Sequence, residues 1–244
     1  MSSFTEQGIV PSKQGFMQQS LTQQASLGMR LRLNDGREFQ YCKNGAGALA
    51  AGQDAQSADT VSTHLNIAVA VAAAVGDVYV TVTLGATNAV IQNQYAEGYF
   101  VINAGAGIGH LYKIKSHPAA AAAASLKVLL YDPIVVALAI ATSKVCLIKH
   151  QCRDVVIGAV AQTGHIVGIA PIAVTALYYF WAETKGMTAS ISGALVATAG
   201  KQIVTSGQTA GSVAVVDAYA EQVIGTAFID GVSAEARPIF LDIV

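Results

Sequence analysis

The chain has 244 residues, of which 53% are hydrophobic and only 12% are charged, and its formal net charge is −1. This length allows one large β-domain or two small domains, and the near-zero charge argues against a nucleic-acid-binding protein, which would carry a basic stripe. About 25% of the residues of an average soluble domain are charged. So few charges indicate that other subunits cover much of the surface, and we expect a homo-oligomer.

The chain shows no sign of secretion or of membrane insertion. Its three cysteines are too few for a disulfide framework and suit folding in a reducing cytoplasm. The first residues lack the basic and apolar regions of a signal peptide. Residues 155–182 contain no Asp, Glu, Lys or Arg and would be long enough to cross a bilayer as a helix. They also contain Pro171 and several glycines, and their apolar residues are mostly β-branched, so we interpret them as buried strands and expect no membrane contact.

Residues 1–28 are rich in glutamine and show no sustained apolar period. Such a segment has no apolar face that it can bury alone. We expect an extended arm that becomes ordered on a neighbouring subunit, and a frayed terminus is the alternative. The aromatic residues Phe4 and Phe16 of this segment are candidate interface or core residues.

Residues 29–42 predict a β-hairpin, because two alternating runs flank Asp35-Gly36, the strongest short-range hairpin signal in the chain. Alternation assigns each side chain to one face of the strands. The side chains expected to face the core are Leu31, Leu33, Phe39 and Tyr41. Those expected outside are Arg30, Arg32, Glu38 and Gln40. A loop of small residues follows at 44–52.

Residues 60–152 predict a second β-module of short strands with glycine-bearing turns. The main expected strands are residues 77–84, 99–102, 111–115, 126–131 and 145–150. The glycines at 105, 107 and 109 indicate a hairpin tip and not a nucleotide loop, because they lack the G-x-G-x-x-G and P-loop spacings and no amphipathic helix follows. The six alanines at 119–124 form either a helical turn or a loop.

The C-terminal third, from residue 170, predicts an antiparallel barrel or sandwich, because short apolar segments alternate with turn residues. These segments are residues 187–191, 195–197, 202–205, 213–216, 223–228 and 238–244. Four consecutive aromatics precede them: Tyr178, Tyr179, Phe180 and Trp181. Neighbours along a strand face opposite sides of the sheet, so we expect two of them in the core and two against another layer or a partner.

Together these elements predict an all-β fold in three parts. The N-terminal hairpin is too small to stand alone, so we expect it to pair with the C-terminal strands. The expected parts are an extended N-terminal arm at residues 1–28, a main β-domain of barrel or sandwich type at 29–59 plus 153–244, and a small inserted β-module at 60–152.

No group of residues in the sequence predicts catalysis. Cys146, His150 and Cys152 share strand parity and, with Cys42 as a distant fourth ligand, would make a zinc site. Their C-x3-H-x-C spacing matches no usual zinc finger, and core thiols are the simpler interpretation. The histidines are scattered, no serine lies in a G-x-S-x-G motif, and the acidic residues form no carboxylate pair. We expect a non-enzymatic protein with no metal and no cofactor.

Several stretches resemble virion structural proteins of tailed bacteriophages, particularly the small β-rich proteins that decorate or cement the capsid. These stretches are LRLNDGREFQYCKNGAGALAAG (31–52), YKIKSHP (112–118), LYDPIVVAL (130–138), AVTALYYFWAETKG (173–186) and EARPIFLDIV (235–244). The resemblance implies a protein, often a trimer, that is made in the host cytoplasm and binds the outer surface of the phage head. There it would bridge capsomers of the major capsid protein. A tail-fibre, tailspike or baseplate protein is the first alternative, and an enzyme or carbohydrate-binding module that uses the aromatic strand is the second.

Overall fold

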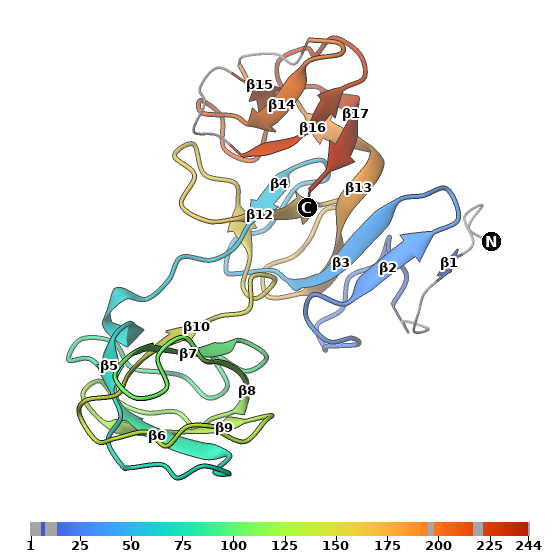
Figure 1. Ribbon diagram of the computed structural model, residues 1–244. Coiled ribbons are helices and arrows are strands. Elements are labelled where there is room, and N and C mark those ends of the chain that lie inside the picture. The colour runs from blue at the N-terminus through green and yellow to red at the C-terminus, as the bar shows by residue number, and fades with distance from the viewer. Residues whose placement is uncertain (1–5, 8–13, 195–197, 217–221, 244) are drawn as a thin grey trace. The chain divides into compact units, whose positions relative to one another are not determined.

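The computed structural model describes residues 6–7, 14–194, 198–216 and 222–243. Over these residues its regular structure is antiparallel β-sheet, apart from a single 3-10 turn, η1 (Ser62–His64). The all-β fold that the sequence predicts is therefore confirmed. Two compact units form: unit 1 comprises residues 1–59 and 151–244, and unit 2 comprises residues 60–150 (Figure 1).

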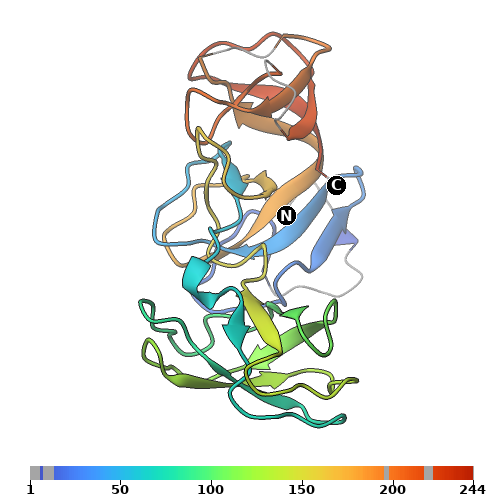
Figure 2. The same cartoon turned by 60° about the vertical axis from the view of Figure 1, so that its left-hand side comes forward.

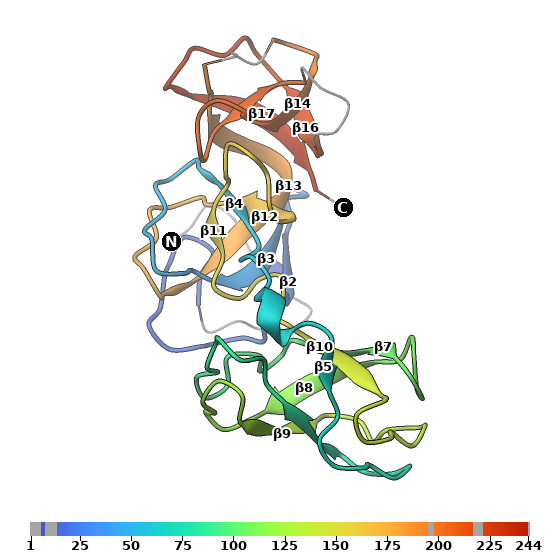
Figure 3. The same ribbon diagram turned by 90° about the vertical axis from the view of Figure 1, so that its left-hand side faces the viewer.

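Unit 2 is a six-stranded antiparallel barrel, whose strands are drawn in Figure 3. Its strands are β5 (Ile67–Ala68), β6 (Tyr79–Thr83), β7 (Tyr99–Ala104), β8 (Leu111–Ser116), β9 (Ser125–Leu130) and β10 (Lys144–Ile148). They are hydrogen-bonded in the order β5-β10-β7-β8-β9-β6. A bridge between Val69 and Val82 joins the two ends of this order, so the barrel has almost no free edge.

The interior of the barrel is filled because the strands alternate strictly. Val80 and Val82 of β6 are 1% and 0% exposed, whereas Tyr79 is 48% exposed. The same period of two places aromatic and aliphatic side chains from the other strands inside. Its turns follow the sequence prediction at the glycines, since positions 105, 107 and 109 all have positive φ. The alanines at 119–124 form a loop with a bridge from Val90 to Ala120, not a helical turn.

Unit 1 is organised around β13 (Tyr179–Ile191), a strand of 13 residues. Its first half pairs with β3 (Glu38–Lys43) and its second half with β17 (Ala236–Asp242). Figure 2 shows this strand, in light orange, running from the blue N-terminal strands to the red C-terminal strands. One long strand therefore joins the N-terminal hairpin to the C-terminal sheet, which is the pairing expected for a hairpin too small to stand alone.

The remaining strands of unit 1 extend this sheet on both sides of β13. They are β1 (Glu6–Gln7), β2 (Arg30–Leu33), β4 (Asp54–Gln56), β11 (Val156–Ile157), β12 (Ile166–Ile169), β14 (Gln202–Thr205), β15 (Val213–Val215) and β16 (Val223–Ala227). The main order is β1-β2-β3-β13-β17-β16-β14-β15. Strand β12 pairs with both β13 and β4, and β4 also pairs with β11. The sheet encloses two apolar clusters, one around Trp181 and one around Ile224.

The β2–β3 hairpin agrees with its predicted pattern at the core positions. Its four predicted core residues are at most 2% exposed. The prediction for Gln40 was wrong, because this side chain is only 7% exposed and its amide nitrogen donates to the carbonyl of Val167. Strand β12 contacts β3, so the side of the hairpin that local alternation assigns to solvent is covered there.

The prediction of an extended arm that becomes ordered on a neighbouring subunit was wrong for residues 14–28, which pack on unit 1 of the same chain. Phe16 and Leu27 are 6% and 3% exposed and belong to the apolar cluster around Trp181. Phe16 packs on Phe39, with ring centroids 5.2 Å apart. These anchors are single residues without helical or strand periodicity, so pattern reasoning missed them. Phe4 lies outside the described residues.

Residues 155–182, the long uncharged stretch, contain β11, β12 and the start of β13. In the part of the chain that the structure describes, no helix has the length and apolar character needed to cross a membrane.

Candidate functional site

The aromatic run at 178–181 is a structural core element. Phe180 and Trp181 are 0% and 1% exposed, and the two tyrosines are half-buried against the same cluster. The Trp181 indole N–H donates to the Gln14 carbonyl at 2.9 Å, and the Tyr41 hydroxyl donates to Oε1 of Gln14 at 2.8 Å. Both faces of β13 are covered here, so two consecutive aromatics are buried. Phe180 and Trp181 therefore offer no open ring face for stacking a sugar.

The cysteines do not form a metal centre in the described parts of the chain, which contain no group of three or more His, Cys, Asp or Glu side chains able to hold an ion. Cys42 and Cys152 lie together in unit 1 as buried cysteines that form no disulfide. Burial, together with a hydrogen bond between the two thiols, raises the pKa of Cys42 well above its usual value. In unit 2, Cys146 accepts a hydrogen bond from the Asn66 backbone N–H at 3.4 Å. His150 stacks on Tyr99.

Two buried histidines flank Tyr95 in unit 2. The Tyr95 hydroxyl lies 2.5 Å from Nδ1 of His64, whose Nε2 lies 3.0 Å from the Asn88 carbonyl. The Tyr95 backbone N–H donates to Nε2 of His117 at 2.9 Å, and Nδ1 of His117 lies 2.8 Å from the Pro118 carbonyl. Burial raises the pKa of Tyr95 to about 12. Because both rings use both of their nitrogens internally, this cluster is a hydrogen-bonded part of the barrel's interior and not an open site.

Two buried carboxyl groups lie in one row of the unit 1 sheet. Asp54 on β4 and Glu183 on β13 are both register partners of Ile169 on β12, so all three side chains share one face. Asp54 is 0% exposed, and neither of its carboxyl oxygens has a hydrogen-bond partner. Burial raises the pKa of Asp54 to about 7 and that of Glu183 to about 7. The sequence gives no sign of this row, because it depends on which strands lie beside β12.

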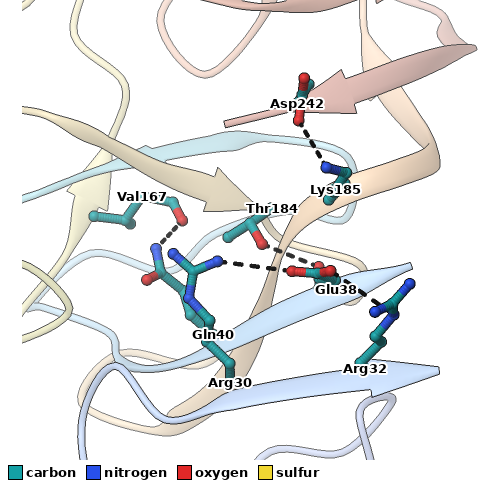
Figure 4. A network of polar contacts seen from close by, with 8 residues as sticks. All are labelled: Arg30, Arg32, Glu38, Gln40, Val167, Thr184, Lys185 and Asp242. Carbon is teal, nitrogen blue, oxygen red and sulfur yellow. Dashed lines mark hydrogen bonds and ion pairs between the residues drawn. The ribbon is translucent and has the colours of Figure 1, made fainter. Parts of the chain in front are cut away.

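A network of charged side chains surrounds the point at which β13 changes partners (Figure 4). Arg30 and Arg32 approach Glu38 at 3.7 and 3.9 Å, and Lys185 approaches Asp242 at 3.4 Å. The arginine side chains are 62% and 70% exposed. Exposed pairs at such distances contribute about 0–1 kcal/mol each, so this network is a solvated surface and not a reactive centre.

Beside that network lies a shallow groove of about 480 Å³. It is lined by Asp35, Gly36, Arg37, Lys185, Gly186, Met187 and Phe240. Its cations are already paired, since Nε of Arg37 lies 2.8 Å from Asp35 and Lys185 contacts Asp242. Met187 and Phe240, which are register partners, are 40% and 47% exposed. The groove thus presents mainly an apolar wall.

The largest gathering of exposed apolar side chains in unit 2 is at one end of its barrel. Strands β5, β7 and β9 run toward this end, and three loops connect them to β6, β8 and β10. We call residues 71–78, 105–110 and 131–143 the loop end. The exposed large aliphatic side chains there are Val71 at 56%, Val75 at 63%, Ile108 at 65%, Val135 at 58% and Ile140 at 56%. The chain enters and leaves the barrel at the opposite end.

Sequence reasoning did not find the loop end. Its apolar residues had the composition of buried strand or turn segments, and only the closed barrel shows that they lie beyond the strand ends. A signal was nevertheless present, because the three loops together contain only two charged residues, Asp77 and Asp132. Connecting loops are normally polar, so uncharged loops between predicted strands indicate a contact surface.

No protein-family model matches the chain, and neither a curated protein nor a solved structure matches it.

Proposed function

We propose that this protein is a non-enzymatic structural protein of a bacteriophage virion, and specifically a decoration or cement protein. It binds the outer surface of the head as a homo-oligomer, with a trimer as the expected form, and bridges capsomers of the major capsid protein. The observation that supports this most is the exposed apolar surface on both units. Ile108 in unit 2 and Phe228 in unit 1 are 65% and 62% exposed, and surfaces of this kind mark protein contacts.

The two-unit architecture suits a bridging role. A capsid under internal DNA pressure fails at the junctions between capsomers, and a protein stabilises a junction by burying surface on both sides of it. Once one unit has bound its capsomer, the other unit on the same chain is held close to the neighbouring capsomer, so the second contact is intramolecular. The lattice then repeats each modest contact many times. Unit 1 offers the apolar wall of Met187 and Phe240, and unit 2 offers exposed side chains outside its loop end, such as Ile91 at 71%.

The main rival from another class, a carbohydrate-binding module, has less support from the aromatic run. Its expected platform was the aromatic run, and Phe180 and Trp181 are buried. A sugar-stacking ring must present a face to solvent. A tail-fibre, tailspike or baseplate role uses the same kind of surfaces and is separated from a head role by stoichiometry.

The deciding experiment is to count copies of the protein in purified virions by quantitative mass spectrometry and to locate them by imaging the particle. We expect on the order of hundreds of copies on the head, because each lattice junction is occupied. A few to tens of copies located in the tail would replace the head role with the tail role. Absence from virions would contradict both.

A matched pair of variants tests the unit 1 contact. We expect Met187→Glu with Phe240→Glu to weaken sedimentation of the purified protein with undecorated heads, because two charges would be desolvated in the interface. The control is Arg30→Glu, which changes an exposed position of the charged network on β2. If the wild type, the double variant and Arg30→Glu bind heads equally, Met187 and Phe240 are not part of the proposed head contact.

A further inference from the structure

The loop end of the unit 2 barrel is almost uncharged. It contains 27 residues, of which 19 are exposed. Among those 19, only Asp77 and Asp132 carry a charge, and the others are Gly, Ala, Val, Ile, Pro, Tyr or Thr. Monomeric proteins rarely expose contiguous apolar patches of more than a few hundred Å². A surface of this composition indicates a partner that covers it.

The three loops form one continuous surface. Ala73 and Leu138 exchange two backbone hydrogen bonds, of 3.1 and 2.8 Å, which join the first loop to the third. The Ser143 hydroxyl donates to the Ala106 carbonyl at 3.1 Å, which joins the third loop to the second. The Asp77 carboxylate accepts the Ala74 N–H at 2.8 Å. Because these bonds fix the loops before any contact is made, binding costs little ordering entropy.

The size and charge of the surface favour a second copy of this chain as the occupant. A standard interface uses roughly 20–30 residues on each side, and 19 exposed residues come close to that size. Permanent interfaces between identical subunits are also more apolar than transient ones. An anionic lipid surface or a nucleic acid would require Lys or Arg, and the loop end has neither.

We propose that copies of this chain associate through the loop end of unit 2. The inference rests on the homo-oligomer of the proposed function and adds the surface that holds it together. Identical uncharged patches can meet around a symmetry axis without needing charge complementarity. The many alanines and glycines allow the backbones of neighbouring copies to approach closely. The chain enters and leaves the barrel at the end opposite to these loops.

The test uses the full-length protein with Val75→Glu and Ile108→Glu combined. Both side chains are more than 60% exposed, at 63% and 65%, so the change should leave the fold intact. The matched control is Ile91→Glu, since Ile91 is 71% exposed but lies in the connection from β6 to β7, at the other end of the barrel. Sedimentation velocity at micromolar concentration is expected to show an oligomer for the wild type and the control, and a monomer for the double variant. Circular dichroism should be the same for all three.

Several outcomes would overturn the inference. They are a monomeric wild type, a double variant that remains oligomeric, and a control that dissociates equally. If the glutamates prevent folding, Val75→Ser with Ile108→Ser provides the milder test, and an unchanged oligomer there counts equally against the surface. A monomeric wild type that sediments with phosphatidylcholine vesicles would indicate a lipid partner instead. An oligomer held by the loop end in a protein that virions lack would remove the proposed function and leave this inference standing.

Discussion

The two units solve the problem of burying a β-sheet in different ways. Unit 2 closes its sheet into a barrel, and the polar side chains that it buries, such as His64, His117 and Ser143, include no carboxyl group. Unit 1 keeps an open sheet in which β13 serves two partners, and it buries polar side chains such as Gln40, Asp54 and Glu183. Closing the sheet leaves few unpaired strand edges. In unit 1, β13 changes from β3 to β17 at Lys185, and the buried Glu183 lies two residues before that point. The stability of unit 1 should therefore depend on individual long-range contacts and on pH more than that of unit 2.

The largest expected difference between the units follows from removing Trp181. Trp181→Ala should lower the free energy of unfolding of unit 1 by about 3–5 kcal/mol, because the indole is 1% exposed and its N–H bond to Gln14 is lost. Hydrogen exchange measured by mass spectrometry should show lost protection in unit 1 peptides and retained protection in unit 2 peptides. Equal loss in both units would show that they unfold together, and no loss would show that the ring contributes little.

The second prediction concerns pH. Asp54 and Glu183 have folded-state pKa values of about 7, raised from 3.8 and 4.5. The folded state therefore binds protons more tightly than the unfolded state. The contribution of these two groups to the free energy of unfolding is complete below about pH 4 and is lost as the pH rises toward about 7. For Asp54 this loss amounts to up to about 4 kcal/mol. Thermal melts followed by the fluorescence of the single tryptophan should show unit 1 weakening over this range.

Asp54→Asn should flatten that pH profile, because the amide cannot ionise. The control is Asp59→Asn, at an exposed position of the same unit, which should leave the profile unchanged. If the thermal stability of the wild type and of Asp54→Asn depends equally steeply on pH, other titrating groups cause the pH dependence.

The third prediction compares the stability cost of substituting two glycines of one turn, and the expected difference is smaller. A Cβ on Gly105 would lie 2.4 Å from the Thr142 carbonyl oxygen, whereas a Cβ on Gly109 would meet nothing within 4 Å. Both have positive φ, of 77° and 87°. Gly105→Ala should cost about 2–3 kcal/mol, from backbone strain and the clash, and Gly109→Ala about 1 kcal/mol, from strain alone. Denaturant melts of the two variants measure this difference, and equal losses would show that the loop end yields to the added methyl group.

The smallest effect is expected at the charged network on β2. Arg32 is 70% exposed and lies 3.9 Å from Glu38, so Arg32→Ala should change the free energy of unfolding by less than about 0.5 kcal/mol. Added salt should reduce even this change, because exposed ion pairs are screened. A loss above 1 kcal/mol in urea melts would mean that the arginine stem contributes packing to the hairpin.

The sequence predicted what depends on neighbouring residues and missed what depends on distant ones. Asp35-Gly36 and the alternation of Leu31 and Leu33 identify the hairpin locally, and the glycine-bearing turns identify the strands of the barrel. The burial of Gln40 and of Phe16 could not be predicted in this way, because each depends on a segment that packs across it from elsewhere in the chain.

The candidate surfaces show the same limit. Phe180 and Trp181 are both buried, but alternation alone could not show that both faces of β13 are covered. The carboxyl row and the loop end went unnoticed for a related reason. Ile169 places Asp54 and Glu183 in one row only through its two pairings, and the loop end exists only because the barrel closes.

The division of β13 between two partners also constrains how the chain is made. Strand β3 ends at Lys43, and its partner β13 begins at Tyr179. At about 5–20 residues per second, a ribosome needs about 7–27 s to add residues 44–178. During that time the N-terminal hairpin has an unpaired edge, while the barrel of unit 2, whose strands pair within residues 60–150, can already be complete. The order of synthesis therefore exposes the unpaired edge of β3 to the cell's chaperones before the rest of the unit 1 sheet exists.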